Sequence, residues 1–157
     1  MSFYLFPVFM MSFFLGITYI EKARVNESSM ESSIQYNSLQ GEDFVNYCGA
    51  VLTFEQNHPT FTGVVTASNL LAQGSLFATF PGVNMVTPTG VNGRVVTCSA
   101  PLSLNAQNAA FSHANGDASY GVSYGGTWLS SQSGSTPQSL ASPVPSGNVV
   151  FVTQVGN

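Results

Sequence analysis

An uncharged apolar run at residues 3–20, FYLFPVFMMSFFLGITYI, constrains this chain more than any other feature. Formal charges begin abruptly after it, at Glu21. As a helix the run would be about 27 Å long at ~1.5 Å per residue, close to the thickness of the hydrocarbon core of a bilayer. Its Leu, Ile, Val and Phe side chains contribute roughly 3 to 6 kcal/mol to insertion. We therefore predict that residues 1–20 form a transmembrane anchor.

Two other structures compete for this run. A cleaved signal peptide normally has Lys or Arg before the apolar segment and a small-x-small site after it, whereas this chain has only Ser2 before the run and ITYIEKARV around its end. A buried soluble helix usually keeps one polar face. Within the run, Ser12 and Gly16 form a small-xxx-small pair, the pattern that lets membrane helices approach closely. This pair is our candidate for a contact with another transmembrane helix.

The rest of the chain is almost free of charge. Only 6% of the 157 residues are charged, the net charge is −4, and after Asn57 only Arg94 and Asp117 carry a formal charge. About 135 residues follow the anchor, which is enough for one domain of ordinary size. Phosphate binding needs clustered Lys and Arg, so nucleic acid is excluded as a partner. The glycines form no phosphate-binding motif, and we expect no small-molecule substrate.

The orientation of the anchor follows from composition. Lys22 and Arg24 directly after the run favour a cytoplasmic location for that side by the positive-inside rule. Long domains translocate largely regardless of charge, so this signal is outweighed. A nearly uncharged domain rich in Ser, Thr and Asn, with two cysteines, is typical of a periplasmic or cell-surface location.

Helical patterns follow the anchor. Residues 21–41 are polar with sparse apolar positions and predict a solvated helical stalk that Gly41 interrupts. Glu42 and Asp43 then place negative charge at the start of a second helix. In that helix one face carries Phe44, Cys48, Val51 and Glu55, with Val45 and Leu52 beside them, and the helix ends before Pro59.

The remaining segments alternate between short helices and strands. We predict helices at residues 66–73 and 104–113, a hairpin of strands 83–87 and 94–98, a strand at 120–124 with a partner at 127–129, a loop at 130–147, and a last strand at 148–155. The predicted fold class is α+β: a transmembrane helix (1–20) and a helical stalk (21–41), followed by a small α+β domain (42–157) with a short, mainly antiparallel sheet.

Cys48 and Cys98 are the only cysteines. They lack C-x-x-C spacing and are too few for a cysteine-rich zinc site. Cys98 ends a predicted strand and can face Cys48 on the core helix, so one long-range disulfide is a candidate if the domain lies in an oxidising compartment. Two unrelated buried thiols remain the alternative.

The chain offers little that resembles a catalytic site. Residues 121–125 match G-x-S-x-G around Ser123, but no helix pattern follows, and no acid or histidine occurs after Asp117. His58 and His113 have no metal-ligand spacing to other residues. We therefore predict no catalytic, cofactor-binding or metal-binding residues and a non-enzymatic protein. An aromatic surface built on Trp128 and nearby tyrosines is a weaker alternative to core packing.

The order of segments resembles a known family. The uncleaved apolar N-terminus, DFVNYCGAVLTFEQNHP at residues 43–59 and PSGNVVFVTQ at residues 145–154 are similar to the PilM proteins of type IVb and conjugative thin-pilus systems, which are distinct from the actin-like PilM. The resemblance implies a structural component of the pilus assembly apparatus or basal body, anchored by a single pass in the bacterial inner membrane, with a periplasmic domain and other pilus-assembly proteins as partners. It implies no cofactor and no catalytic residue.

Two alternatives to a component of the pilus assembly apparatus stay open. A minor pilin or pseudopilin also joins an apolar helix to a small α+β head, but its cleavage glycine precedes the apolar helix, whereas here Gly16 and Glu21 come at the end of the run. A surface adhesin or carbohydrate-binding module would use the strands that contain Tyr and Trp.

Overall fold

The computed structural model of the protein describes residues 5–90, 93–132 and 134–156, with side chains described from residue 30 onward. The chain divides into two compact units, Met1–Tyr36 and Asn37–Asn157. The described part of the first is the N-terminal part of helix α1, and the second contains the sheet, its core and the other helices.

Helix α1 (Leu5–Asn57) is continuous, so the predicted interruption at Gly41 is wrong. Gly41 is buried in the helix, and a Cβ built there would lie 2.5 Å from Ala110 N on α3. The glycine therefore permits a close helix crossing and does not end a helix.

In the part of the chain that the structure describes, no helix is both long and apolar enough to cross a membrane. The predicted anchor at residues 1–20 falls on residues 1–4, which are not described, and on residues whose side chains lie outside the description. The anchor therefore stays a prediction.

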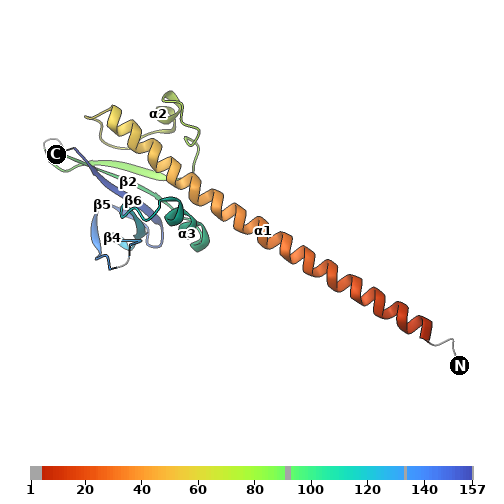
Figure 1. Ribbon diagram of the computed structural model, residues 1–157. Coiled ribbons are helices and arrows are strands. Elements are labelled where there is room, and N and C mark those ends of the chain that lie inside the picture. Colours follow the sequence, from red (N-terminus) through yellow and green to blue (C-terminus); the bar gives the residue numbers. More distant parts are fainter. Residues whose placement is uncertain (1–4, 91–92, 133, 157) are drawn as a thin grey trace. The chain divides into compact units, whose positions relative to one another are not determined.

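The second unit is built on one six-stranded sheet (Figure 1) with the order β1-β2-β6-β3-β4-β5. Its strands are β1 (Val83–Pro88), β2 (Arg94–Ala100), β3 (Tyr120–Ser123), β4 (Gly125–Ser130), β5 (Gln138–Val144) and β6 (Val149–Val155). Each pair of neighbours is antiparallel, as predicted. The predicted loop at residues 130–147 is partly wrong, because it contains β5.

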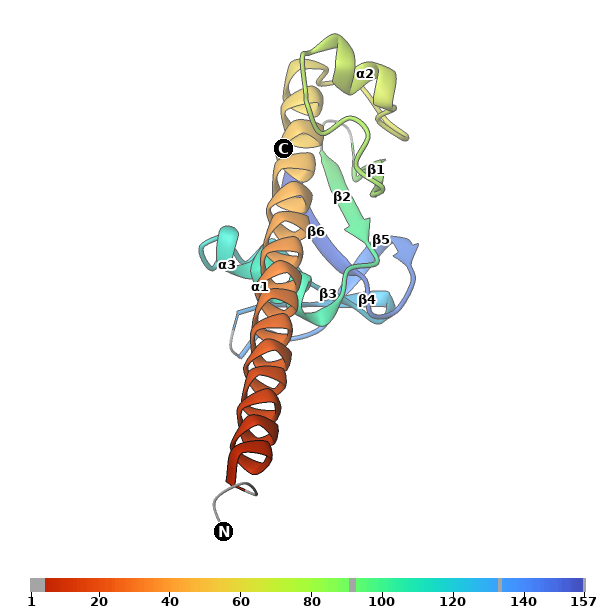
Figure 2. The ribbon, with the colours of Figure 1, turned by 90° about the vertical axis from the view of Figure 1, so that its right-hand side faces the viewer.

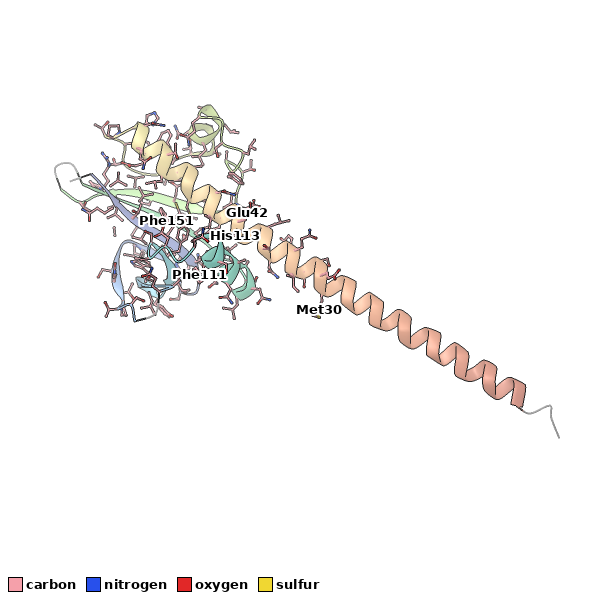
Figure 3. All side chains as sticks on the ribbon, in the orientation of Figure 1. Met30, Glu42, Phe111, His113 and Phe151 are labelled. Atoms are coloured by element: carbon pink, nitrogen blue, oxygen red, sulfur yellow. The ribbon has the colours of Figure 1, made fainter. Side chains whose placement is uncertain are left out.

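The last part of α1 lies along one face of the sheet, beside β2 and β6 (Figures 1 and 2). Apolar residues at helical spacing bury there, as the sequence predicted, and meet alternating residues of the central strands. The core contains Phe44, Tyr47, Cys48, Val51 and Phe54 of α1, and Val86, Val96, Cys98, Tyr120, Val149 and Phe151 of the sheet. Phe151 and the partly buried Phe111 of α3 are labelled in Figure 3.

Two short helices flank this core, and each begins with an N-cap whose side chain accepts a backbone hydrogen bond. In α2 (Ala67–Ala72) the side chain of Thr66 accepts a hydrogen bond from Asn69 N, and in α3 (Leu104–His113) the side chain of Ser103 accepts one from Ala106 N. Helix α2 is joined to α1 by a 2.8 Å hydrogen bond from Gln73 Nε2 to Ala50 O.

The other face of the sheet carries a smaller core. Trp128, Val144 and Val150 are buried there, with Leu140 and Val152 partly buried against them. Because β5 also lies close to β1 and β2, the sheet curls and partly encloses this second face. This curvature produces a hollow between β1 and β5.

Candidate functional site

Cys48 of α1 and Cys98 of β2 are both fully buried in the main core, and both are free thiols. Burial, and after it a hydrogen bond with Cys98, raise the pKa of the Cys48 thiol well above its ordinary value. The fold therefore brings the two sulfur atoms together across the interface of helix and sheet. The disulfide itself stays a prediction.

Ser12 and Gly16, the predicted contact with another transmembrane helix, lie among the residues whose side chains are not described. That contact also stays a prediction.

Ser123, the serine of the G-x-S-x-G match, is fully buried at the end of β3 and donates a short hydrogen bond from Oγ to Pro145 O. Its backbone is bonded on both sides, from Ser123 N to Asn148 O at 3.0 Å and from Gly147 N to Ser123 O at 2.9 Å. Strand β4 follows it instead of the helix that a nucleophile elbow needs. The arrangement fastens the β5–β6 connection to the sheet.

The two histidines lie at helix ends. The ring of His58 stacks on Phe54 with centroids 4.1 Å apart, and its Nδ1 lies 2.8 Å from Phe54 O. His113 occupies the last turn of α3. Among the described residues, no group of three His, Cys, Asp or Glu side chains is placed to hold a metal ion.

The predicted aromatic surface is divided between the two faces of the sheet. Tyr120 belongs to the main core and Trp128 to the smaller one, and each is at most 5% exposed. Tyr124 between them is exposed. Core packing, the stronger expectation from the sequence, therefore accounts for Tyr120 and Trp128.

A hollow of about 450 Å³ lies on the second face of the sheet, where β1 and β5 approach each other. We call it the β1–β5 groove. Its walls come from both outer strands, the end of β2 and the adjoining loops, and its lining residues are Val64, Pro81, Val83, Asn84, Met85, Thr97, Ser99, Pro101, Ser142, Pro143, Val144, Pro145 and Asn148. Its volume falls within the usual range of ligand pockets.

Sequence reasoning missed this groove and also a buried ion pair. Arg94 at the start of β2 pairs with Glu55 near the end of α1, and the carboxylate of Glu55 is fully buried. The sequence placed Glu55 on the buried face of its helix and showed that Arg94 is one of two formal charges after Asn57. A buried charge needs a partner, so these two observations together could have predicted the pair.

These features define the class: a small α+β domain whose antiparallel sheet packs on the end of a long helix. The chain belongs to the PilM family, whose model matches residues 9–152. The predicted resemblance is thus confirmed, and the protein is related to pili.

A solved structure described as a putative PilM protein from Escherichia coli B7A is similar to this chain. The TM-score is 0.51 at 16% sequence identity, over 76% of this chain and 92% of that chain. Likeness at this identity supports the fold alone. The curated proteins include no significant match.

Proposed function

We propose that the protein is a non-enzymatic component of the assembly apparatus or basal body of a type IVb, conjugative thin pilus. The observation that carries the proposal is the match of the PilM family model over residues 9–152. In this role the chain is a scaffold that holds other pilus-assembly proteins at the membrane.

The proposed location is the bacterial inner membrane, with a single pass and the sheet domain in the periplasm. The uncharged run at residues 3–20 supports the anchor because its length suits a bilayer. The neutral polar composition of the domain supports the periplasmic side.

A scaffold role agrees with the contacts of Ser123 and His58, whose side chains hold parts of the fold together. The hydroxyl of Ser123 is donated to a backbone carbonyl, and His58 stacks on Phe54. Exposed apolar residues support protein contacts instead: Met30, labelled in Figure 3, and Ile34 are 65% and 61% exposed and lie four residues apart on α1. Side chains four apart share one helix face, which suits packing against a partner helix.

Membrane fractionation with N-terminal sequencing tests the anchor. The expected product is an uncut chain in the inner-membrane fraction, released by detergent and not by alkali or high salt. A full-length chain that stays in the supernatant contradicts the anchor. Deletion of the gene tests the role separately: we expect loss of pili and restoration by the full chain, whereas normal piliation in the deletion strain contradicts the assembly role.

A minor pilin or pseudopilin is the second candidate, favoured by one observation. Helix α1 has 53 residues, and its last part packs on an antiparallel sheet, as expected of an apolar helix that runs into a small head. Sheared pili distinguish the two: a subunit of the fibre is found there with a shortened N-terminus, whereas a component of the apparatus stays in the cell envelope.

A further inference from the structure

We propose that a pocket beside Arg94 binds a carboxylate group. The pocket has a volume of about 500 Å³ and lies at the end of the sheet where β2 begins, and we call it the Arg94 pocket. Its described lining residues come from the segment after α1, the connection from β1 to β2 and the end of the chain: Pro59, Thr60, Thr62, Pro88, Gly90, Gly93, Arg94 and Gly156. All of them belong to the second unit, so the proposal depends neither on the membrane anchor nor on the proposed function.

The first argument is the state of the Arg94 side chain. It is 10% exposed and pairs through Nε with the fully buried carboxylate of Glu55. Nε is enclosed, whereas the two terminal Nη groups are not fully enclosed and make no hydrogen bond in the part of the chain that the structure describes. The accessible tenth of the side chain therefore includes Nη–H donors that an occupant of the pocket can reach.

The second argument is the direction of the ion pair. The carboxylate of Glu55 has no exposed surface, while Arg94 lines the pocket. An occupant can therefore touch the guanidinium group but not the carboxylate behind it. Because the attraction at the shorter distance exceeds the repulsion at the longer one, the pocket favours a negative charge. No described lining residue is an Asp or Glu that would oppose it.

The third argument is that this positive charge is not a general property of the chain. Arg94 is the only Lys or Arg after Asn57, in a segment of a hundred residues. An arginine on the surface would normally have its charged end in water, whereas this one is nine-tenths buried and ends in a pocket. The charge is therefore specific to this site.

The fourth argument separates a carboxylate from a phosphate. Phosphate sites combine several cations or use the N-terminus of a helix, whereas this pocket has one cation and lies beyond the C-terminus of α1, whose dipole disfavours a multiply charged anion. A single planar guanidinium group matches the two oxygens of one carboxylate. The hydroxyl groups of Thr60 and Thr62, at exposed positions, add neutral donors at the rim.

Saturation-transfer difference NMR with the full chain in phosphatidylcholine nanodiscs tests the proposal, with empty nanodiscs for subtraction. The two ligands are N-acetyl-Ala-Ala and its C-terminal amide, which differ only in the carboxylate. We expect saturable binding of the free acid, with an affinity at least about tenfold higher than that of the amide.

Acetate as a competitor distinguishes two sources of the carboxylate. If it displaces the dipeptide at equal concentration, the pocket serves small free carboxylates. If displacement needs a large excess, the pocket binds the carboxylate of a polypeptide, since the rest of the dipeptide then contributes to affinity.

Three variants localise the binding. Thr60→Asp adds a negative charge at an exposed position of the rim and should weaken binding of the free acid at least about fivefold without unfolding the domain. Asn105→Asp, at an exposed position of α3 outside the pocket, adds the same charge and is the matched control. Glu55→Leu/Arg94→Met leaves no buried charge, should therefore stay folded, and should bind the acid and the amide equally.

Four results overturn the proposal: no saturable binding of the free acid above empty nanodiscs, equal affinity of the wild type for acid and amide, a preference for the acid that persists in Glu55→Leu/Arg94→Met, or equal weakening by Thr60→Asp and Asn105→Asp. Inorganic phosphate that displaces the free acid at lower concentration than acetate does would also overturn it, because the ligand would then be a phosphate.

Discussion

Asn84 of β1 donates a hydrogen bond from Nδ2 to Tyr47 Oη of α1 at 2.7 Å, although the two residues lie 37 positions apart. The same amide also binds both backbone groups of Val65, accepting from Val65 N at 2.7 Å and donating to Val65 O at 2.9 Å. One buried side chain thus joins the core helix, the first strand and the segment before α2.

The first prediction concerns this junction. Asn84→Ala should lower the free energy of unfolding by about 2 to 4 kcal/mol, because it leaves the buried N–H and C=O of Val65 without their partner and removes one of the two hydrogen bonds of the Tyr47 hydroxyl. Urea denaturation followed by circular dichroism measures the change. Asn108→Ala, at an exposed position on α3, is the matched control and should change stability by less than about 0.5 kcal/mol. Equal effects of the two substitutions would contradict the prediction.

The second prediction uses two glycines of α1. A Cβ at Gly41 would lie 2.5 Å from Ala110 N and 2.7 Å from Ala106 O, whereas a Cβ at Gly49 meets nothing within 4 Å. Gly49→Ala should therefore stabilise the protein by about 0.5 to 1 kcal/mol through helix propensity. Gly41→Ala should destabilise it by about 1 to 3 kcal/mol, because α3 must move away. Thermal denaturation of both variants checks the opposite signs, and a stabilising Gly41→Ala would exclude the close crossing.

These two glycines show what sequence patterns can and cannot reveal. The ends of α3 follow from local signals, since Ser103 caps its start and Asn115 and Gly116 adopt positive φ angles after its end. The role of Gly41 as a point of close approach between α1 and α3 is a tertiary contact, which no local pattern encodes. Strand β5 was missed for a similar reason, because it is polar, contains Pro143 and is an edge strand held only by β4.

Among the candidate sites, too, one was predictable from local sequence patterns and one was not. The buried face of α1 was predictable, because Phe44, Cys48 and Val51 repeat at helical spacing. The β1–β5 groove was not, because it arises where the first and last strands of a curled sheet approach each other. Such a site depends on twist and strand order, which only the folded sheet determines.

The third prediction concerns the ion pair of Glu55 and Arg94, whose side chains are 0% and 10% exposed. Removing one partner leaves a buried charge uncompensated, so Glu55→Leu and Arg94→Met should each cost about 3 to 5 kcal/mol. The double variant Glu55→Leu/Arg94→Met should recover most of that loss, because no charge remains buried. Chemical denaturation gives the coupling energy of this double-mutant cycle.

Glu42→Gln serves as the control for this cycle, because Glu42 lies on an exposed position of the same helix and should be nearly neutral. Additive effects of the two single substitutions would show that Glu55 and Arg94 do not act as a pair.

The fourth prediction is a loss of stability at alkaline pH. Burial, partly offset by the hydrogen bond from Asn84, raises the pKa of Tyr47 from 10.0 to about 12. The unfolded tyrosine loses its proton from about pH 10, while the folded one retains it until about pH 12. The unfolded state therefore binds fewer protons in this window, and the free energy of unfolding falls as the pH rises from 10 to 12.

The raised pKa of the Cys48 thiol acts in the same direction and begins lower, near about pH 8.5, where an unfolded cysteine titrates. Urea denaturation under reducing conditions at pH 8 to 11 measures the slope. Tyr47→Phe should lower stability at pH 8, because the hydrogen bonds of its hydroxyl with Asn84 and Gly82 are lost, and should flatten the decline above pH 10. Unchanged stability up to pH 11 in the wild type would be incompatible with this prediction.

The fifth prediction is the disulfide between Cys48 and Cys98. If the domain folds in an oxidising compartment, exchange with a disulfide-donating oxidoreductase would oxidise the two thiols and reduce the donor to its dithiol. The link would close a loop of about 50 residues and stabilise the protein by about 4 kcal/mol in the chain-entropy model. Protein from the cell envelope, alkylated before lysis, should have a mass two hydrogens below that of the reduced chain and carry no alkyl group.

Burial provides the sharper test of when this bond forms. Both thiols are fully buried, so an oxidant reaches them only before folding is complete or during an opening of α1 from the sheet. Reduced, folded protein should therefore react slowly with oxidised glutathione, and mild urea should accelerate the reaction. Cys48→Ala, which leaves Cys98 alone, should show no intramolecular product. Protein from the cell envelope that has the reduced mass, and whose two thiols are both alkylated once it is denatured, would rule out the bond.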